Sequence, residues 1–191
     1  VTIGAGSYDL GDVYGSSNDL FVFTAHDNLN LSGNLDFKIS DEAVNRNDSM
    51  LGFLTAGTLK LEPGTSIKFA GSEIGMASAD EMRIIEVSLE ADSDISLHSL
   101  EDMVINDSTF LTKGLVSDDE VSLQAYNELS INGLTFSNSV RQIWMEAMTI
   151  NLQNINFPSG SQVNLTSLYG PLDGKYPTFG SGNQQPGRVN F

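Results

Sequence analysis

A short pattern recurs along this chain, and it restricts the fold more than any other feature. In each copy an apolar residue lies two positions before an alanine, and two apolar residues, two positions apart, follow after a polar step. The copies are FVFTAHDNLNL around Ala25, GFLTAGTLKL around Ala56, VSLEADSDISL around Ala91, VSLQAYNELSI around Ala125 and IWMEAMTINL around Ala147. Repetition in a fixed order predicts units that bury their apolar faces by stacking on one another.

The alternation of apolar and polar residues within each copy is typical of β-strands. The alanines are 22 to 35 residues apart, and the shortest interval matches one coil of a three-sided parallel solenoid, about 20 to 25 residues. The sequence therefore predicts a single all-β domain over residues 1–191, a right-handed parallel β-helix (β-solenoid), three-sided, with loop insertions. An antiparallel sandwich or jelly roll is the alternative fold.

Small side chains recur where a coil has to turn sharply, so we expect the alanines to point inward at a narrow corner. Turn-forming and charged residues gather in three longer segments, at 40–50, 71–81 and 112–120, which we expect to bulge out as loops. Helical periodicity is scarce, and residues 79–89 are the best candidate for one short helix. The chain is thus expected to be almost entirely β.

Composition excludes several classes of partner. The formal net charge is −16, from 25 acidic and 9 basic residues, so nucleic acid and anionic lipid surfaces would repel the chain. No stretch approaches the roughly 18 apolar residues that span a bilayer, so no membrane insertion is expected. The chain has no cysteine, which excludes disulfides and thiolate chemistry. Cations are the small partners that such a charge favours.

The last quarter of the chain carries a resemblance. The segment INLQNINFPSGS runs from alternation into a turn, and the GPLDGKYP loop and the closing PGRVNF follow it. This stretch resembles the C-terminal part of large repeat-rich bacterial secreted proteins, of the FecR-associated or filamentous-haemagglutinin-like β-solenoid kind. The resemblance implies an extracellular or cell-surface location and a structural or adhesive role. It carries over no catalytic residue.

Metal and histidine chemistry find little support in the sequence. The two histidines, His26 and His98, each follow a residue expected to point inward, so alternation places both outward. Acidic residues gather most densely at Asp118, Asp119 and Glu120, which makes these three a weak candidate site for Ca²⁺, a cation that binds carboxylate and carbonyl oxygens. An ordinary solvated turn is the alternative. No other cofactor is expected.

Adjacent carboxylates can also serve glycoside hydrolysis, and Asp118 with Asp119 would be the first choice. Neighbouring strand residues point in opposite directions, however, and the single tryptophan, Trp144, is far from them in sequence. We therefore expect no enzyme. The alternative is a carbohydrate-active parallel β-helix, either a polysaccharide hydrolase or a module that binds surface glycans through an exposed aromatic or polar strip.

The two ends of the chain suggest how such a protein would be used. The opening VTIGAGSYDLG and the closing PGRVNF are strand-like, and neither contains an amphipathic helix that could cover a terminal coil. Terminal coils without a cap can pair with those of an identical chain, which yields an open filament. The sequence therefore predicts an extracellular structural or adhesive solenoid that self-associates through its terminal coils, in its sharpest form as a fibre.

Overall fold

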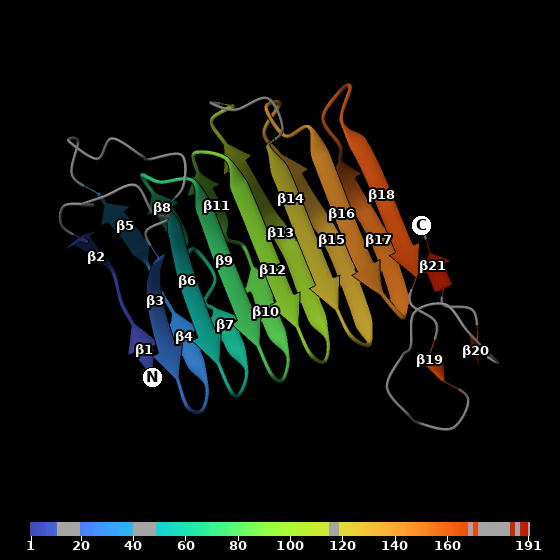
Figure 1. Ribbon diagram of the computed structural model, residues 1–191, viewed down its shortest axis with the longest axis horizontal. Coiled ribbons are helices and arrows are strands. Elements are labelled where there is room, and N and C mark those ends of the chain that lie inside the picture. The colour runs from blue at the N-terminus through green and yellow to red at the C-terminus, as the bar shows by residue number, and fades with distance from the viewer. Residues whose placement is uncertain are drawn as a thin grey trace.

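The computed structural model confirms a parallel β-solenoid (Figure 1). It describes residues 1–10, 20–39, 49–114 and 119–167, together with the short strands 170–171, 184–185 and 188–190. These residues contain strands, turns and bends but no helix, and residues 79–89, the best candidate for a short helix, instead contain strand residues at 82–85 and from 88 onward. Consistently, no helix in this part of the chain could cross a membrane.

Strands from successive coils stack side by side to form three faces. The strands of face I are β3 (Leu20–Ala25), β6 (Met50–Thr55), β9 (Glu73–Ser78), β12 (Asp94–Ser99), β14 (Glu120–Ala125), β16 (Gln142–Ala147) and β18 (Gln162–Ser167). The strands of face II are β1 (Thr2–Ile3), β4 (Leu29–Leu31), β7 (Leu59–Leu61), β10 (Met82–Ile85), the first half of β13 (Met103–Thr112), β15 (Glu128–Phe136) and β17 (Thr149–Asn156).

Face III continues the sheet of face II around a bend. Its strands are β2 (Gly6–Asp9), β5 (Asn34–Lys38), β8 (Ser66–Phe69), β11 (Ser88–Ala91), the second halves of β13 and β15, and the end of β17. Near the C-terminus, β21 (Arg188–Asn190) pairs with β17, and the antiparallel pair β19 (Gly170–Pro171) and β20 (Gln184–Gln185) stands apart. All other described pairs are parallel, which excludes the antiparallel sandwich.

The core is a column of inward side chains in which each coil covers the next. Inward residues of the middle coils have exposed fractions of 0 to 5%. Phe37 and Phe53 pack edge to face with 5.7 Å between ring centroids. Because the backbone register is fixed, an inward residue in one coil meets an inward residue in the next, and apolar alternation in the sequence is sufficient to specify the core.

The turn from face I to face II is a small-residue corner, as the sequence predicts, but the predicted register is only partly right. Ala25, Ala125 and Ala147 occupy this corner, whereas Ala56 is exposed and lies one residue beyond it, and Ala91 ends a strand of face III. The small-residue corner consists of Ala25, Thr55, Ser78, Ser99, Ala125 and Ala147.

Serine and threonine fit this corner because only small side chains have room there and because a hydroxyl can bind nearby carbonyl groups. The Ser99 hydroxyl donates to the carbonyls of Asp80 and Asp102, at 2.6 and 2.9 Å, and the Ser78 hydroxyl donates to Asp80 at 3.0 Å. The bond from Ser99 to Asp80 ties adjacent coils together, whereas the other two bonds lie within a coil. Because serine rather than alanine occupies the corner at Ser78 and Ser99, the alanine alignment missed these two coils. Residues 71–81, which were expected to form a loop, contain strand β9.

The bend from face II to face III is a left-handed corner that sequence reasoning missed. One residue in each of six successive coils has positive φ there, and only half of these residues are glycine. The left-handed corner consists of Gly33, Gly64, Glu86, Asp107, Gly133 and Asn154, with φ between 45° and 81°. Positive φ favours glycine and tolerates Asn and Asp, so the requirement concerns the backbone rather than a recognisable motif.

Of the other two expected loops, 40–50 lies outside the described residues at 40–48, and 112–120 does so at 115–118, with Thr112 ending β13 and Glu120 beginning β14. Ser49 and Asp119 lie at the turn from face III to face I. That turn contains Ser49, Ser72, Ser93 and Asp119 in four successive coils, followed by Arg141 in the next, and is called the serine corner below.

Ala125→Leu should destabilise the fold by about 1 to 3 kcal/mol, because Ala125 is 2% exposed in the small-residue corner and a larger side chain would be overpacked. Ala56→Leu is the matched control and should change stability by less than about 0.5 kcal/mol, because Ala56 is exposed. Urea unfolding measures both. Equal effects for the two variants would contradict the corrected register.

Gly133→Ala should cost about 2 to 4 kcal/mol, because an L residue is strained at φ 81° and its Cβ would lie 3.2 Å from Asp107 Cα and overlap the Asp107 carboxylate. Gly64→Ala, at φ 80° with open space around it, should cost only about 1 kcal/mol. Chemical denaturation of both variants, alone and with Asp107→Gly, separates strain from overlap. Asp107→Gly should recover stability only when it is combined with Gly133→Ala.

Candidate functional site

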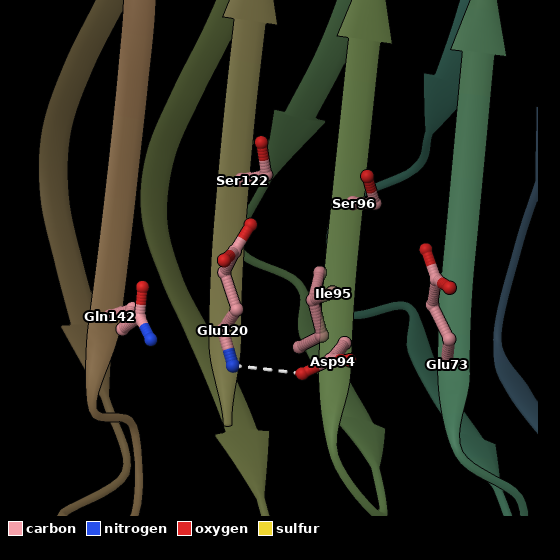
Figure 2. A pocket seen from close by; sticks show the side chains of 7 residues that line it. All are labelled: Glu73, Asp94, Ile95, Ser96, Glu120, Ser122 and Gln142. Carbon is pink, nitrogen blue, oxygen red and sulfur yellow. Dashed lines mark hydrogen bonds between the residues drawn. The ribbon is translucent and has the colours of Figure 1, made fainter. Parts of the chain in front are cut away.

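The outer surface of face I contains a hollow of about 330 Å³ (Figure 2). It spans four neighbouring strands, from β9 to β16, and polar groups dominate its surface. Its lining consists of Glu73, Asp94, Ile95, Ser96, Glu120, Ser122 and Gln142. These residues come from four coils, so only the coil register brings them together.

The floor of the hollow is low because one row of outward positions holds small residues. In this row Gly75, Ser96 and Ser122 pair with one another, and Trp144 follows on β16. A Cβ at Gly75 would overlap the methyl group of Met50, so the Met50 side chain covers that glycine. The result is a short depression with serine hydroxyls at its base.

A row of carboxylates forms one wall. Glu73 pairs directly with Asp94, and the register of β12 and β14 places Asp94 beside Glu120. Adjacent strands are about 4.8 Å apart, so three acids stand close together. Burial raises the pKa of Glu73, and the charges of Asp94 and Glu120 raise it further. A carboxyl group held partly out of water beside like charges retains its proton to higher pH.

Hydrogen bonds fix two members of this row. Asp94 Oδ1 accepts the backbone N–H of Glu120 at 2.8 Å (Figure 2). The same oxygen accepts the Ser93 hydroxyl at 3.0 Å. Burial and the charge of Asp94 raise the pKa of Glu120, while a hydrogen bond from the Trp144 side chain lowers it. Trp144 is 40% exposed and bonds to Glu120, one of the acids that line the hollow, although Trp144 itself is not part of that lining.

The structure separates the residues of the calcium prediction. Asp118 lies outside the described residues. Asp119 is fully buried at the serine corner, whereas Glu120 lines the outer hollow. Asp119 and Glu120 therefore do not face a common site. Within the described ranges, no three His, Cys, Asp or Glu side chains gather closely enough to hold a metal ion.

Both histidines are exposed, as alternation predicts. His26 contacts Asp27 at 3.7 Å at the end of β3, and His98 lies on β12, with β6 and β9 between those strands. The two side chains form no common site.

Sequence reasoning missed the hollow because its acids are dispersed. Glu73, Asp94 and Glu120 are more than 20 residues apart along the chain, and no local motif joins them. Aligning the outward positions of successive coils by their register would have brought these three acids together. The misplaced alanines prevented this alignment, because they concealed the coil that contains Glu73.

No protein-family model, no curated protein and no solved structure matches this chain. The resemblance to secreted repeat-rich proteins therefore stays an expectation, and function has to be argued from the residues themselves.

Glu73→Gln should raise stability at neutral pH by about 0.5 kcal/mol, the size of one like-charge cross-strand repulsion. The folded chain binds the Glu73 proton more tightly than the unfolded chain, because its pKa is raised from 4.5. Stability is therefore lost as pH rises from 4.5 through the raised folded pKa. In the variant this loss should be smaller.

Unfolding free energies measured across that pH interval test the prediction. Glu146→Gln is the control, because Glu146 lies on the same face but outside the hollow. A pH profile for Glu73→Gln identical to that of the wild type would refute the repulsion.

Proposed function

We propose that this chain is an extracellular structural or adhesive β-solenoid that extends by stacking its terminal coils on those of identical chains. The proposed role requires no catalysis. The observation that supports it is the exposure of core-type side chains at the N-terminal end of the stack. The extracellular location follows from the resemblance to secreted proteins.

Inward residues of the first coil are less well covered than their counterparts in the next coil. Phe21 and Phe23 are only partly buried, although their paired residues, Leu51 and Phe53, are fully buried. Ile3 and Tyr8 are likewise only partly buried beside fully buried partners on face II and face III. Ring contacts between coils, such as that of Phe23 with Phe53 at 5.4 Å between centroids, have no further coil to continue into beyond the first described one.

A second copy of the chain suits this surface. Strand β3 is the outermost strand of face I at one end and β18 at the other, and both run in the same direction. The inward residues Val163 and Leu165 of β18 are also incompletely buried. Parallel pairing of β18 with β3 of another copy would continue the register and cover both sets, a head-to-tail contact that does not close.

Val22→Lys should weaken this association, because a charge on an edge strand opposes pairing with another strand. Val22 is 41% exposed on β3. Leu54→Lys is the matched control: Leu54 is 43% exposed but lies on β6, which has neighbours on both sides. Light scattering and electron microscopy over a concentration series should show assemblies for wild type and Leu54→Lys, and mainly monomers for Val22→Lys. Monodisperse wild type at high concentration would remove the proposal.

A second candidate function is carbohydrate binding or hydrolysis at the hollow of face I. The observation that favours it is the exposed Trp144 ring beside Glu120, since aromatic faces offer apolar contact and carboxylates accept hydrogen bonds from hydroxyls. Glu73 and Glu120 are two strands apart, about 9.5 Å at the backbone, which lies within the range of carboxylate separations in inverting hydrolases.

Glycan arrays and hydrolysis assays on neutral polysaccharides test this candidate. Trp144→Ala should lose at least about 10-fold in affinity, equivalent to an exposed stacking contact of about 1.4 kcal/mol, while Glu146→Gln should retain binding. Turnover that Glu73→Gln and Glu120→Gln abolish would establish hydrolysis. If no glycan is bound or cleaved, the hollow has no carbohydrate role.

A further inference from the structure

The two ends of the stack are incomplete coils that complement each other (Figure 1). At the N-terminal end β1 and β2 supply faces II and III, but no strand in the described part of the chain lies beside β3 on its outer side. At the C-terminal end β18 supplies face I and β21 supplies face II, while no described strand extends face III beyond β17. Each end therefore lacks a face that the other end carries.

The side chains left uncovered agree with this complementarity. Phe157, directly after β17, is 39% exposed, although its ring stacks at 6.1 Å on that of Phe136, which is 5% exposed. The row that contains Phe136 begins at Gly6 on β2, a residue without a side chain to obstruct an incoming ring. At the other end Phe23 is only partly buried. In a head-to-tail contact β2 of one copy would cover Phe157, and β18 of the other would cover Phe23.

Face II is the exception, because both ends supply it. Strand β1 pairs in parallel with β4 at one end, and β21 pairs in parallel with β17 at the other. The strand pairs place Thr2, Asn151 and Asn190 on one outward row. A second copy that continues the stack in register would bring its Thr2 beside Asn151, which is the place that Asn190 holds. A strand edge has one set of backbone groups to pair, so β1 and β21 exclude each other.

Strand β21 reproduces the residue pattern of β1. Residues 1–3 read VTI and residues 189–191 read VNF, so each stretch is apolar, polar and apolar in order. The register places Val189 on the inward row of Ile150, which is 0% exposed. Because alternation decides which residues a strand turns toward the core, β21 fits this place in the same register as β1 of a second copy.

The connection of β21 to the stack leaves it able to unpair. Within the stack a face I strand leads directly into a face II strand, and only Met148 separates β16 from β17. By contrast, residues 168–187 separate β18 from β21. A connection of that length lets β21 leave β17 while β18 stays in place.

We propose that β21 is an autoinhibitory strand, which holds the place on face II where β1 of a second copy pairs with β17 and must leave before copies stack. The inference rests on the head-to-tail stacking proposed above and adds a competition between two strands. Only molecules in which β21 is unpaired can accept a second copy, so the apparent affinity between copies falls by that fraction.

A disulfide that holds β21 in place tests the competition, and the chain has no cysteine of its own. Asn151→Cys with Asn190→Cys joins paired positions of neighbouring strands, about 4.8 Å apart and within the span of a disulfide. Light scattering should show monomers for the oxidised variant at concentrations at which the reduced variant assembles. Ser130→Cys with Asn151→Cys, which ties β15 to β17 and leaves β21 free, is the matched control and should assemble in both states.

Weakening β21 should have the opposite effect. Val189→Asp should lower the concentration at which assemblies appear by about 10-fold, the factor expected when β21 is paired in about nine of ten molecules. Gln184→Asp, on β20 of the antiparallel pair that stands apart, is the control and should leave this concentration unchanged. Adding Thr2→Cys and Asn151→Cys to Val189→Asp should give a disulfide between copies on oxidation, because these positions lie at opposite ends of one chain's stack.

The outcomes separate this competition from the stacking itself. Equal assembly of the oxidised and reduced Asn151→Cys, Asn190→Cys variant, or an unchanged assembly concentration for Val189→Asp, would overturn the competition and leave the stacking intact. If no variant assembles and the disulfide between copies does not form even with Val189→Asp, both the stacking and the competition are wrong.

Discussion

Parallel pairing of each coil with the next, in one fixed register, is the constraint on which the rest of the structure depends. It makes every position in a coil the neighbour of equivalent positions in two other coils. Inward positions must be apolar along the whole stack, and Leu59, Met82 and Met103 illustrate how different side chains meet this demand on one row. Outward positions carry no such demand and are free to differ.

The three corners of a coil impose three different requirements, and this explains how much of the fold the sequence predicted. Alternation identified the strands, because apolar side chains are what the core requires. The small-residue corner was recognised only where alanine occupies it, since Thr55, Ser78 and Ser99 satisfy the same steric limit with a hydroxyl. A search for small residues, rather than for alanine, would have found all of these coils.

The left-handed corner was not predictable from residue identity. Gly64, Glu86 and Asp107 share a backbone conformation, although the first has no side chain and the other two carry carboxylates. Asp107 and Gly133 also depend on each other, because the carboxylate of one fills the space that a Cβ of the other would need. Such pairing between coils becomes visible only when the register is known. The hollow on face I escaped prediction for the same reason.

Charges on the outward faces are arranged in two different ways. On face III, Asp36, Lys68 and Glu90 alternate in sign on one row, and Lys68 lies 3.5 Å from Glu90. On face I the corresponding row places Glu73, Asp94 and Glu120 together without a base among its described members. Alternating charges stabilise stacking, whereas like charges oppose it. The acidic row on face I therefore opposes the stacking of β9, β12 and β14.

At the serine corner the backbone carbonyl makes the hydrogen bonds to the next coil, and the side chain does not have to make them. The carbonyl of Ser72 accepts N–H groups from both Ser93 and Asp94, and the carbonyl of Asp119 accepts those of Arg141 and Gln142 in the same manner. These paired bonds restore the register as the chain enters face I, even where intervals between coils differ in length. Because the backbone carbonyl does this work, the side chain at the corner can change from hydroxyl to carboxylate without loss of the fold.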